Sequence, residues 1–256
     1  MIDLIEKYTT TTSNGVLSKG IYKIDNKLYY VKGNSVSANK IGYEPFSEVM
    51  ASEIASLLNI THIPYKLAPA KQFPEIHTYK CDYVSVCPML QIPVGSSLVH
   101  LGDYLRANYP IQNMWLRTTR DILGTQFFYR MLLFDAFIGN EDRHLNNIDV
   151  IISAKGVLPA PLFDNGGSLL AWRSSTVINK KSLYLDVNDS QPFARTHNKQ
   201  VMLVDEACFT PFDLQEFYAQ ILVKIEPTLC LLSVARARAI RNYLSDRLKY
   251  LEWGFM

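Results

Sequence analysis

The order of the predicted elements indicates an α+β protein with two unequal lobes. Strand signals gather in the first third of the chain and helical periodicity dominates the remainder, as in an α+β rather than an alternating α/β fold. Apolar residues make up 48% of the 256 residues, enough for a substantial core, and this length suits a single domain. We therefore expect a sheet-rich lobe at residues 1–92 and a mainly helical lobe at residues 93–256.

A tight β-hairpin is the first predicted element. Residues 21–24 and 27–32 are rich in β-branched and aromatic side chains, which favour strands. Between them, Asp25 and Asn26 tolerate the positive φ angles that a two-residue hairpin turn requires. The hairpin places residue 32 at the end of its second strand.

One helix separates this hairpin from further strands. Glu44 and Pro45 open the helix, because proline is favoured in a first turn, and apolar residues then repeat at helical spacing to residue 58. Two more strands are expected at residues 63–67 and 79–90.

Helical periodicity dominates from about residue 101. The longest apolar pattern predicts one helix over residues 118–138, followed by short strands and two closing helices. The strands are expected at residues 148–153 and 161–163, and the helices at residues 211–223 and 229–251.

Charge and cysteine content argue against several classes of protein. The 26 basic and 24 acidic residues leave a net charge of +2, which does not favour direct nucleic-acid binding. No segment approaches the ~18 consecutive apolar residues of a membrane span, and no signal peptide is visible. The four cysteines form no C-x-x-C pair, as is typical of reduced thiols. We expect a bacterial cytoplasmic protein with no membrane span, with secretion as an effector left open.

Two polar motifs, each at the end of an apolar segment, carry the chemistry. Residues 139–147 read Gly-Asn-Glu-Asp-Arg-His-Leu-Asn-Asn, and Asp164 ends a second apolar segment, with Gly166 suited to a tight turn. Phosphoryl transfer needs a carboxylate that accepts the proton of the attacking hydroxyl, and oxygen ligands for Mg²⁺. Asp142 is a candidate for the base, and Asn147 and Asp164 are candidates for the metal ligands.

Both motifs, with the segment 191–200 downstream, resemble those of HipA-like kinases. The resemblance covers most of the chain and is sharp at these motifs. It implies a two-lobed protein-kinase-like fold that uses ATP and Mg²⁺ to phosphorylate a serine or threonine of a protein substrate, with autophosphorylation in some members. It also implies a short kinase core of the toxin or effector kind, with an antitoxin protein as a candidate partner. By this likeness Asp142 is the catalytic base, and Asn147 and Asp164 hold Mg²⁺.

Lys32 and a carboxylate on the predicted helix complete the expected nucleotide site. Lys32 ends the second hairpin strand, where its ammonium can meet the α- and β-phosphates of ATP. The likeness points to Glu48 as its partner. A helical wheel, however, places Glu48 opposite the apolar face and Glu53 within it. Glu48 is the first choice and Glu53 the alternative.

Two loops are also expected to contact the nucleotide. Ser13, Gly15 and Ser18 lie in a small, polar segment before the hairpin that suits a loop covering the phosphates. By the family likeness, Ser13 and Ser18 are candidates for autophosphorylation. Met89 and Leu90 follow a predicted strand and are placed in the hinge that would hold adenine.

Asp135 falls on the apolar side of the helix predicted for residues 118–138. A buried carboxylate needs a partner. We predict that Asp135 braces the catalytic loop through backbone N–H groups or through Arg143.

Two other functions stay open. Phosphatidylinositol kinases share the Asp-Arg-His-x-x-Asn loop, but they are usually much larger and continue the second motif as Asp-Phe-Gly, where this chain has Asp-Asn-Gly. A catalytically silent partner-binding module usually loses one residue of the site, whereas the lysine, the base and both metal-ligand candidates are present here. An active protein kinase is therefore the favoured hypothesis.

Overall fold

A five-stranded antiparallel sheet forms the amino-terminal part of the computed structural model. The structure describes residues 5–9, 17–37, 40–174, 190–205 and 214–254. The strands lie in the order β1-β2-β3-β7-β6. They are β1 (Ile5–Thr9), β2 (Lys19–Ile24), β3 (Lys27–Lys32), β6 (Lys66–Pro69) and β7 (Tyr83–Pro88). Between the strands of this sheet the chain forms β4 (Val36–Ser37), β5 (Lys40–Ile41) and the 3₁₀ helix η1 (Ala70–Gln72).

The β2–β3 hairpin confirms the sequence prediction. Its turn consists of Asp25 and Asn26, with φ angles of 49° and 62°, as a two-residue hairpin turn requires. At the other end of the hairpin Lys19 lies directly opposite Lys32. Residues directly opposite each other in an antiparallel pair project to the same face, so both lysines leave the sheet on one side.

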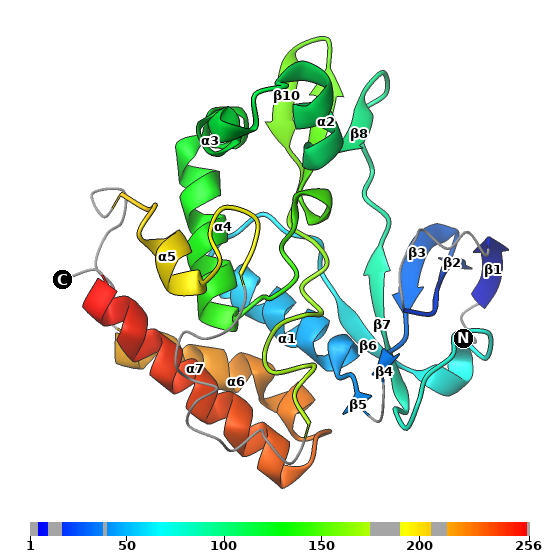
Figure 1. Cartoon of the computed structure of the whole chain (residues 1–256). Coiled ribbons are helices and arrows are strands. Elements are labelled where there is room, and N and C mark those ends of the chain that lie inside the picture. Colours follow the sequence, from blue (N-terminus) through cyan, green and yellow to red (C-terminus); the bar gives the residue numbers. More distant parts are fainter. Residues whose placement is uncertain (1–4, 10–16, 38–39, 175–189, 206–213, 255–256) are drawn as a thin grey trace.

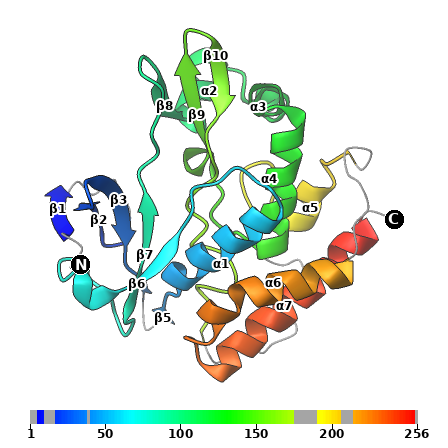
Figure 2. The ribbon, with the colours of Figure 1, turned by 180° about the vertical axis from the view of Figure 1, so that it is seen from behind.

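Helix α1 (Glu44–Leu57) is enclosed by both parts of the molecule. It contacts β6 and β7 of the sheet and α6 of the helical part, an arrangement that can be followed from behind in Figure 2. Every residue from Glu44 to Ser52 is buried. The polar face of the helix is therefore buried as well as its apolar face.

Helices form most of the remaining chain, and the predicted α+β class with a helical second part is confirmed (Figure 1). They are α2 (Leu101–Asn108), α3 (Trp115–Leu123), α4 (Thr125–Ile138), α5 (His197–Val201), α6 (Leu214–Leu229) and α7 (Val234–Gly254). Two 3₁₀ helices are η2 (Gln112–Met114) and η3 (Leu145–Asn147). A second antiparallel sheet, of order β10-β9-β8, contains β8 (Ser97–His100), β9 (Asp149–Ser153) and β10 (Gly156–Pro159).

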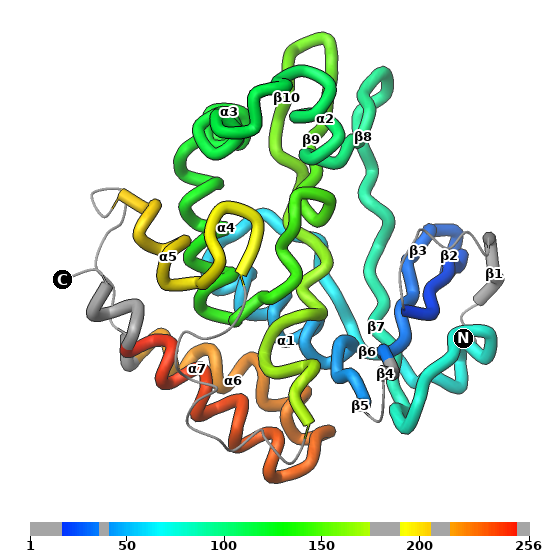
Figure 3. The backbone as a smooth tube through the Cα atoms, viewed as in Figure 1, coloured from blue at the N-terminus to red at the C-terminus, as the bar shows by residue number. Residues whose placement is uncertain are grey.

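The connection from β7 to β8 joins the two sheets. Figure 3 shows the chain leaving β7 and running along the molecule to β8. Met89, the first residue after β7, donates its backbone N–H to the carbonyl of Leu28 at 2.9 Å. The connection therefore starts beside Leu28 of β3, where it continues the pairing between β3 and β7.

Some predicted elements are wrong or displaced. The helix predicted over residues 118–138 is two helices, α3 and α4, because Gly124 has φ 79° and ψ 138°, a conformation that glycine adopts readily and that interrupts a helix. Residues 161–163 form no strand, although Leu162 makes an isolated parallel bridge to His62. Strands β1, β4, β5, β8 and β10 were not predicted; β4 and β5 have two residues each, too few to show a period.

One large core joins α1 to the helical part. Met50 of α1, Leu132 of α4, Ile225 of α6 and Leu244 of α7 belong to this core and are fully buried. The lobes therefore share packing across α1, and a boundary at residue 92 stays a prediction. Within the described ranges, no helix is long and apolar enough to cross a membrane.

Candidate functional site

Lys32 lies between two carboxylates that come from distant parts of the chain. Its Nζ is 2.8 Å from Oδ1 of Asp164 and 3.1 Å from Oε1 of Glu48. The Tyr65 hydroxyl lies 3.4 Å from the same Nζ. The side chains of Lys32 and Glu48 are only 12% and 2% exposed, so this pair is largely shielded from bulk water, whereas Asp164 is 33% exposed.

Glu48, rather than Glu53, is the carboxylate of α1 beside Lys32. Glu48 is buried and its Oε2 also accepts the backbone N–H of Asn165 at 2.8 Å. The helical wheel favoured Glu53 because it assumes that only the apolar face of a helix is buried. Since every residue of α1 from Glu44 to Ser52 is buried, the polar side of this part of the helix lies in the site instead.

The two carboxylates of this cluster respond differently to one shared cation. Burial raises the pKa of Glu48 to about 7, against the opposing effect of the Lys32 ammonium. Burial acts in the same direction on Asp164, but the Lys32 charge and its hydrogen bond hold the pKa of Asp164 below its usual value. Of the two carboxylates, Asp164 is therefore the one that stays ionised near neutral pH.

Glu48→Gln should change how stability depends on pH. The pKa of Glu48 rises from 4.5 to about 7 in the folded chain, so its stabilising contribution is complete below pH 4.5 and is lost as the pH rises through about 7. The wild type should therefore lose on the order of 2–3 kcal/mol relative to Glu48→Gln over this window. Urea unfolding of both proteins at several pH values measures this. A wild type that gained stability over the variant with rising pH would contradict the assigned direction.

The catalytic-loop candidate begins where α4 ends. Gly139 caps α4 in the left-handed conformation, with φ 62°, and a Cβ there would collide with the Tyr243 hydroxyl. After this turn the Asn140 side chain accepts the backbone N–H of Asp142 at 3.1 Å. Glycine and asparagine at these positions therefore set the direction in which the loop carries Asp142 into the site.

Arg143 anchors the catalytic-loop candidate to α4 and to the segment that carries Asp164. It is fully buried, and its Nε lies 3.0 Å from Oδ2 of Asp135 in α4. The predicted brace between Asp135 and Arg143 is therefore present. Arg143 also donates to the carbonyls of Asn147 at 2.9 Å and Phe163 at 2.8 Å, and to the Asn165 side chain. One guanidinium thus connects the loop to the segment that carries Asp164.

Asp142 and Asn147 lie side by side at the open edge of this network. The Asn147 amide donates to the carbonyl of Asp142 at 2.8 Å and lies 3.5 Å from its Oδ2. The Asp142 side chain is 39% exposed, so the hydroxyl of an acceptor can reach its carboxylate. Burial raises its pKa, His144 opposes this, and the negative charge of Asp164 raises the pKa further. The two carboxylates of Asp142 and Asp164 are therefore close enough to repel each other electrostatically.

Asp164 itself makes the turn that follows Phe163. Its φ is 55°, a left-handed conformation that aspartate tolerates better than most residues. Gly166, expected to supply this turn, has no positive φ. It lies against α1 instead, where a Cβ would come within 3.1 Å of the Glu44 Cβ. Tight packing against α1, not turn geometry, is the structural use of this glycine.

The remaining predicted residues make no side-chain contact with the cluster that the structure records, or lie outside the described chain. Ser13 and Gly15 lie outside the described residues. Ser18 is half-buried, and its Oγ accepts the backbone N–H of His77 at 2.9 Å. Met89 and Leu90 are half-buried at the start of the connection after β7, where Met89 already uses its N–H on Leu28. Nucleotide contacts of these residues stay predictions.

Lys19 is a basic residue of the site that was not singled out from the sequence. It projects beside Lys32 from β2. Burial lowers its pKa, the Asp164 carboxylate opposes this, and the Lys32 ammonium lowers the pKa further. The available signal was the hairpin register, which places the two lysines opposite each other. A second cation at this point suits a polyanionic ligand.

The donor set suits Mg²⁺ held jointly by protein and phosphate. Carboxylate and amide oxygens are preferred Mg²⁺ ligands, and this ion usually keeps few protein ligands alongside substrate phosphates. Asn147 uses its Nδ2 as a donor, which leaves its Oδ1 as the ligand atom, and Asp164 supplies a charged oxygen. Among the described residues no three His, Cys, Asp or Glu side chains cluster as a metal site.

Comparison with solved structures identifies the fold. CtkA, a proinflammatory kinase of Helicobacter pylori, matches with a TM-score of 0.71 over 99% of this chain and 95% of its own, at 19% identity. The chain has a HipA-like kinase fold. HipA of Shewanella oneidensis MR-1, from a toxin–antitoxin system with HipB and operator DNA, matches with a TM-score of 0.50 over 99% of this chain and 67% of its own, at 12% identity. No protein-family model and no curated protein matches the sequence.

The HipA-like fold confirms the resemblance stated from the sequence motifs. At these identities the likeness concerns the fold, and a kinase-type function agrees with it. Acceptor, cofactors and partners depend on the site itself.

Proposed function

We propose that this protein is an ATP-dependent protein kinase that transfers the γ-phosphate to a serine or threonine hydroxyl with the help of Mg²⁺. The observation that carries the proposal is the cluster of Lys32, Glu48 and Asp164, with Asp142 and Asn147 on the adjoining loop. A lysine–glutamate pair, a metal-binding aspartate and a loop with a base and an asparagine are the parts that protein kinases use.

Each residue has a defined task in this mechanism. Lys32, held by Glu48, binds the α- and β-phosphates of ATP. Asn147 and Asp164 would hold Mg²⁺, which supplies charge neutralisation on the β- and γ-phosphates. Asp142 accepts the proton of the acceptor hydroxyl. At the same time the hydroxyl oxygen bonds to the γ-phosphorus, and the bond from that phosphorus to the β–γ bridging oxygen breaks, which releases ADP. Lys32 exchanges its present contact with Asp164 for the phosphates.

Phosphate transfer from γ-labelled ATP tests the proposal. Wild-type protein with Mg²⁺ should label itself or an added protein. Asp164→Ala should lose both the label and most Mg²⁺-dependent ATP binding, because it removes the charged metal ligand. Transfer to phosphatidylinositol but not to protein would favour a lipid kinase. No label together with no Mg²⁺-dependent ATP binding would favour a silent binding module.

The toxin–antitoxin role is a further part of the proposal. It draws on the HipA neighbour, which was solved with HipB and operator DNA. We propose a protein antitoxin as a partner of this chain, a location in the bacterial cytoplasm, and no direct contact with nucleic acid. Co-expression with the product of an adjacent gene, followed by co-purification, tests the partner.

A further inference from the structure

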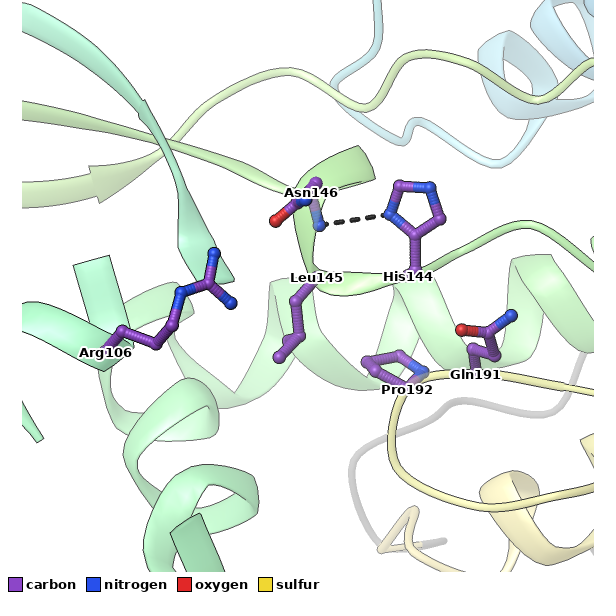
Figure 4. Close-up of a pocket in the computed structure, with 6 residues that line it drawn as sticks. All are labelled: Arg106, His144, Leu145, Asn146, Gln191 and Pro192. Atoms are coloured by element: carbon purple, nitrogen blue, oxygen red, sulfur yellow. Dashed lines mark hydrogen bonds between the residues drawn. The ribbon is translucent and has the colours of Figure 1, made fainter. Parts of the chain in front are cut away.

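An open pocket of about 370 Å³ lies beside the catalytic-loop candidate (Figure 4). Three parts of the chain build it: α2, the loop that ends in η3, and the segment that leads to α5. Its lining consists of Arg106, His144, Leu145, Asn146, Gln191 and Pro192. In Figure 4 Arg106 and Gln191 lie on opposite sides of Leu145.

Gly102 brings α2 against the loop and thereby forms one wall. A Cβ on Gly102 would lie 2.7 Å from Oδ1 of Asn146 and 3.2 Å from Cβ of Leu145, so any larger residue there would push Asn146 and Leu145 away. Nη1 of Arg106, one helical turn later, would be 3.3 Å from the same Cβ. The guanidinium of Arg106 therefore lies next to Asn146 at the edge of the pocket.

The polar groups of the lining suit an anionic side chain. Arg106 brings a permanent positive charge to the lining, and the amides of Asn146 and Gln191 are further donors. Asp103 accepts from Nη2 of Arg106 at 2.6 Å, but both side chains of this pair are more than half exposed. Such pairs contribute little, so the guanidinium can share its charge with an incoming carboxylate. Leu145 and Pro192 offer apolar contact to the methylene groups of that side chain.

His144 connects the pocket to the proposed base. Its Nδ1 accepts the backbone N–H of Asn146 at 3.2 Å, so the opposite nitrogen, Nε2, faces Asp142 at 3.9 Å from Oδ1. An acceptor hydroxyl must come within about 3 Å of the Asp142 carboxylate. An extended chain advances about 3.3 Å per residue. A side chain one or two residues from the hydroxyl can therefore reach the edge of the pocket that His144 forms.

We propose that this pocket receives an aspartate or glutamate of the acceptor protein, one or two residues from the hydroxyl that is phosphorylated. The inference rests on the proposed kinase function. It assigns substrate preference to Arg106, which lies on α2, outside the nucleotide cluster.

A positional-scanning library of serine- and threonine-centred peptides, with γ-labelled ATP, tests the inference. The wild type should label peptides with Asp or Glu at one such flanking position about three- to tenfold more than peptides with Lys there. Arg106→Glu should abolish or invert this preference. Asp103→Asn, which removes the competing carboxylate, should strengthen it. Arg117→Glu is the matched control, because Arg117 is also an exposed helical arginine with an aspartate partner, and it should keep the wild-type preference.

The outcomes separate this inference from the proposed function. Peptide labelling without an acidic preference, or with a preference that Arg106→Glu retains, overturns the inference and leaves the kinase proposal standing. Label on the protein itself but on no peptide overturns the inference alone. No label anywhere, with no Mg²⁺-dependent ATP binding, overturns both.

Discussion

Asp142→Ala is expected to lower the rate of phosphate transfer by about 10²- to 10⁴-fold, the usual contribution of a general base, while ATP affinity stays nearly unchanged. The carboxylate is the group that would take the hydroxyl proton, and it makes no contact with Lys32 that the structure records. Its side-chain contact with Asn147 is long, at 3.5 Å, so its loss should not displace the metal ligand. Transfer kinetics and equilibrium binding of Mg²⁺–ATP measure the two effects separately.

Asp121→Asn provides the control for Asp142→Ala, because Asp121 is an exposed carboxylate on α3. Its transfer rate should match the wild type. The wild-type rate should also fall at acidic pH, since burial raises the pKa of Asp142 and a protonated base cannot accept the hydroxyl proton. Full activity in Asp142→Ala would refute the base assignment. Loss of ATP binding in the same variant would mean that Asp142 shapes the nucleotide site instead.

Arg143→Met is expected to destabilise the folded protein by about 3–5 kcal/mol, because breaking a buried ion pair leaves a buried charge without compensation. The Asp135 carboxylate would keep the hydrogen bond that the Asn140 side-chain amide donates. The carbonyls of Asn147 and Phe163 would lose a donor at the same time. Denaturant unfolding measures the loss. Phosphate transfer should fall too, since both metal-ligand segments are attached to this guanidinium.

Arg241→Met is the matched control for Arg143→Met. Arg241 also pairs with a carboxylate, Glu226 at 2.7 Å, but this pair is partly exposed, so its loss should destabilise the protein far less. Asp135→Ala should be less destabilising in the Arg143→Met background than in the wild type, because the two changes remove the same interaction. Equal losses in Arg143→Met and Arg241→Met would show that the buried network does not brace the loop.

The local features of the fold were readable because they depend on neighbouring residues. Asp25 and Asn26 adopt the positive φ angles that their types tolerate, and Pro45 lies in the first turn of α1, where its missing N–H costs no hydrogen bond. The helix predicted over residues 118–138 failed at a single glycine, Gly124. Periodicity on both sides of a glycine does not reveal whether it continues or interrupts a helix.

The sequence by itself determined the hairpin, the helix that carries Glu48 and the spacing of Asp142 and Asn147 on one loop. Only the tertiary structure decided that Glu48 rather than Glu53 meets Lys32, because that choice depends on what surrounds α1. It also decided that Asp164, 132 residues beyond Lys32 in sequence, lies 2.8 Å from its ammonium. Such contacts follow from packing between distant segments, which local periodicity does not encode.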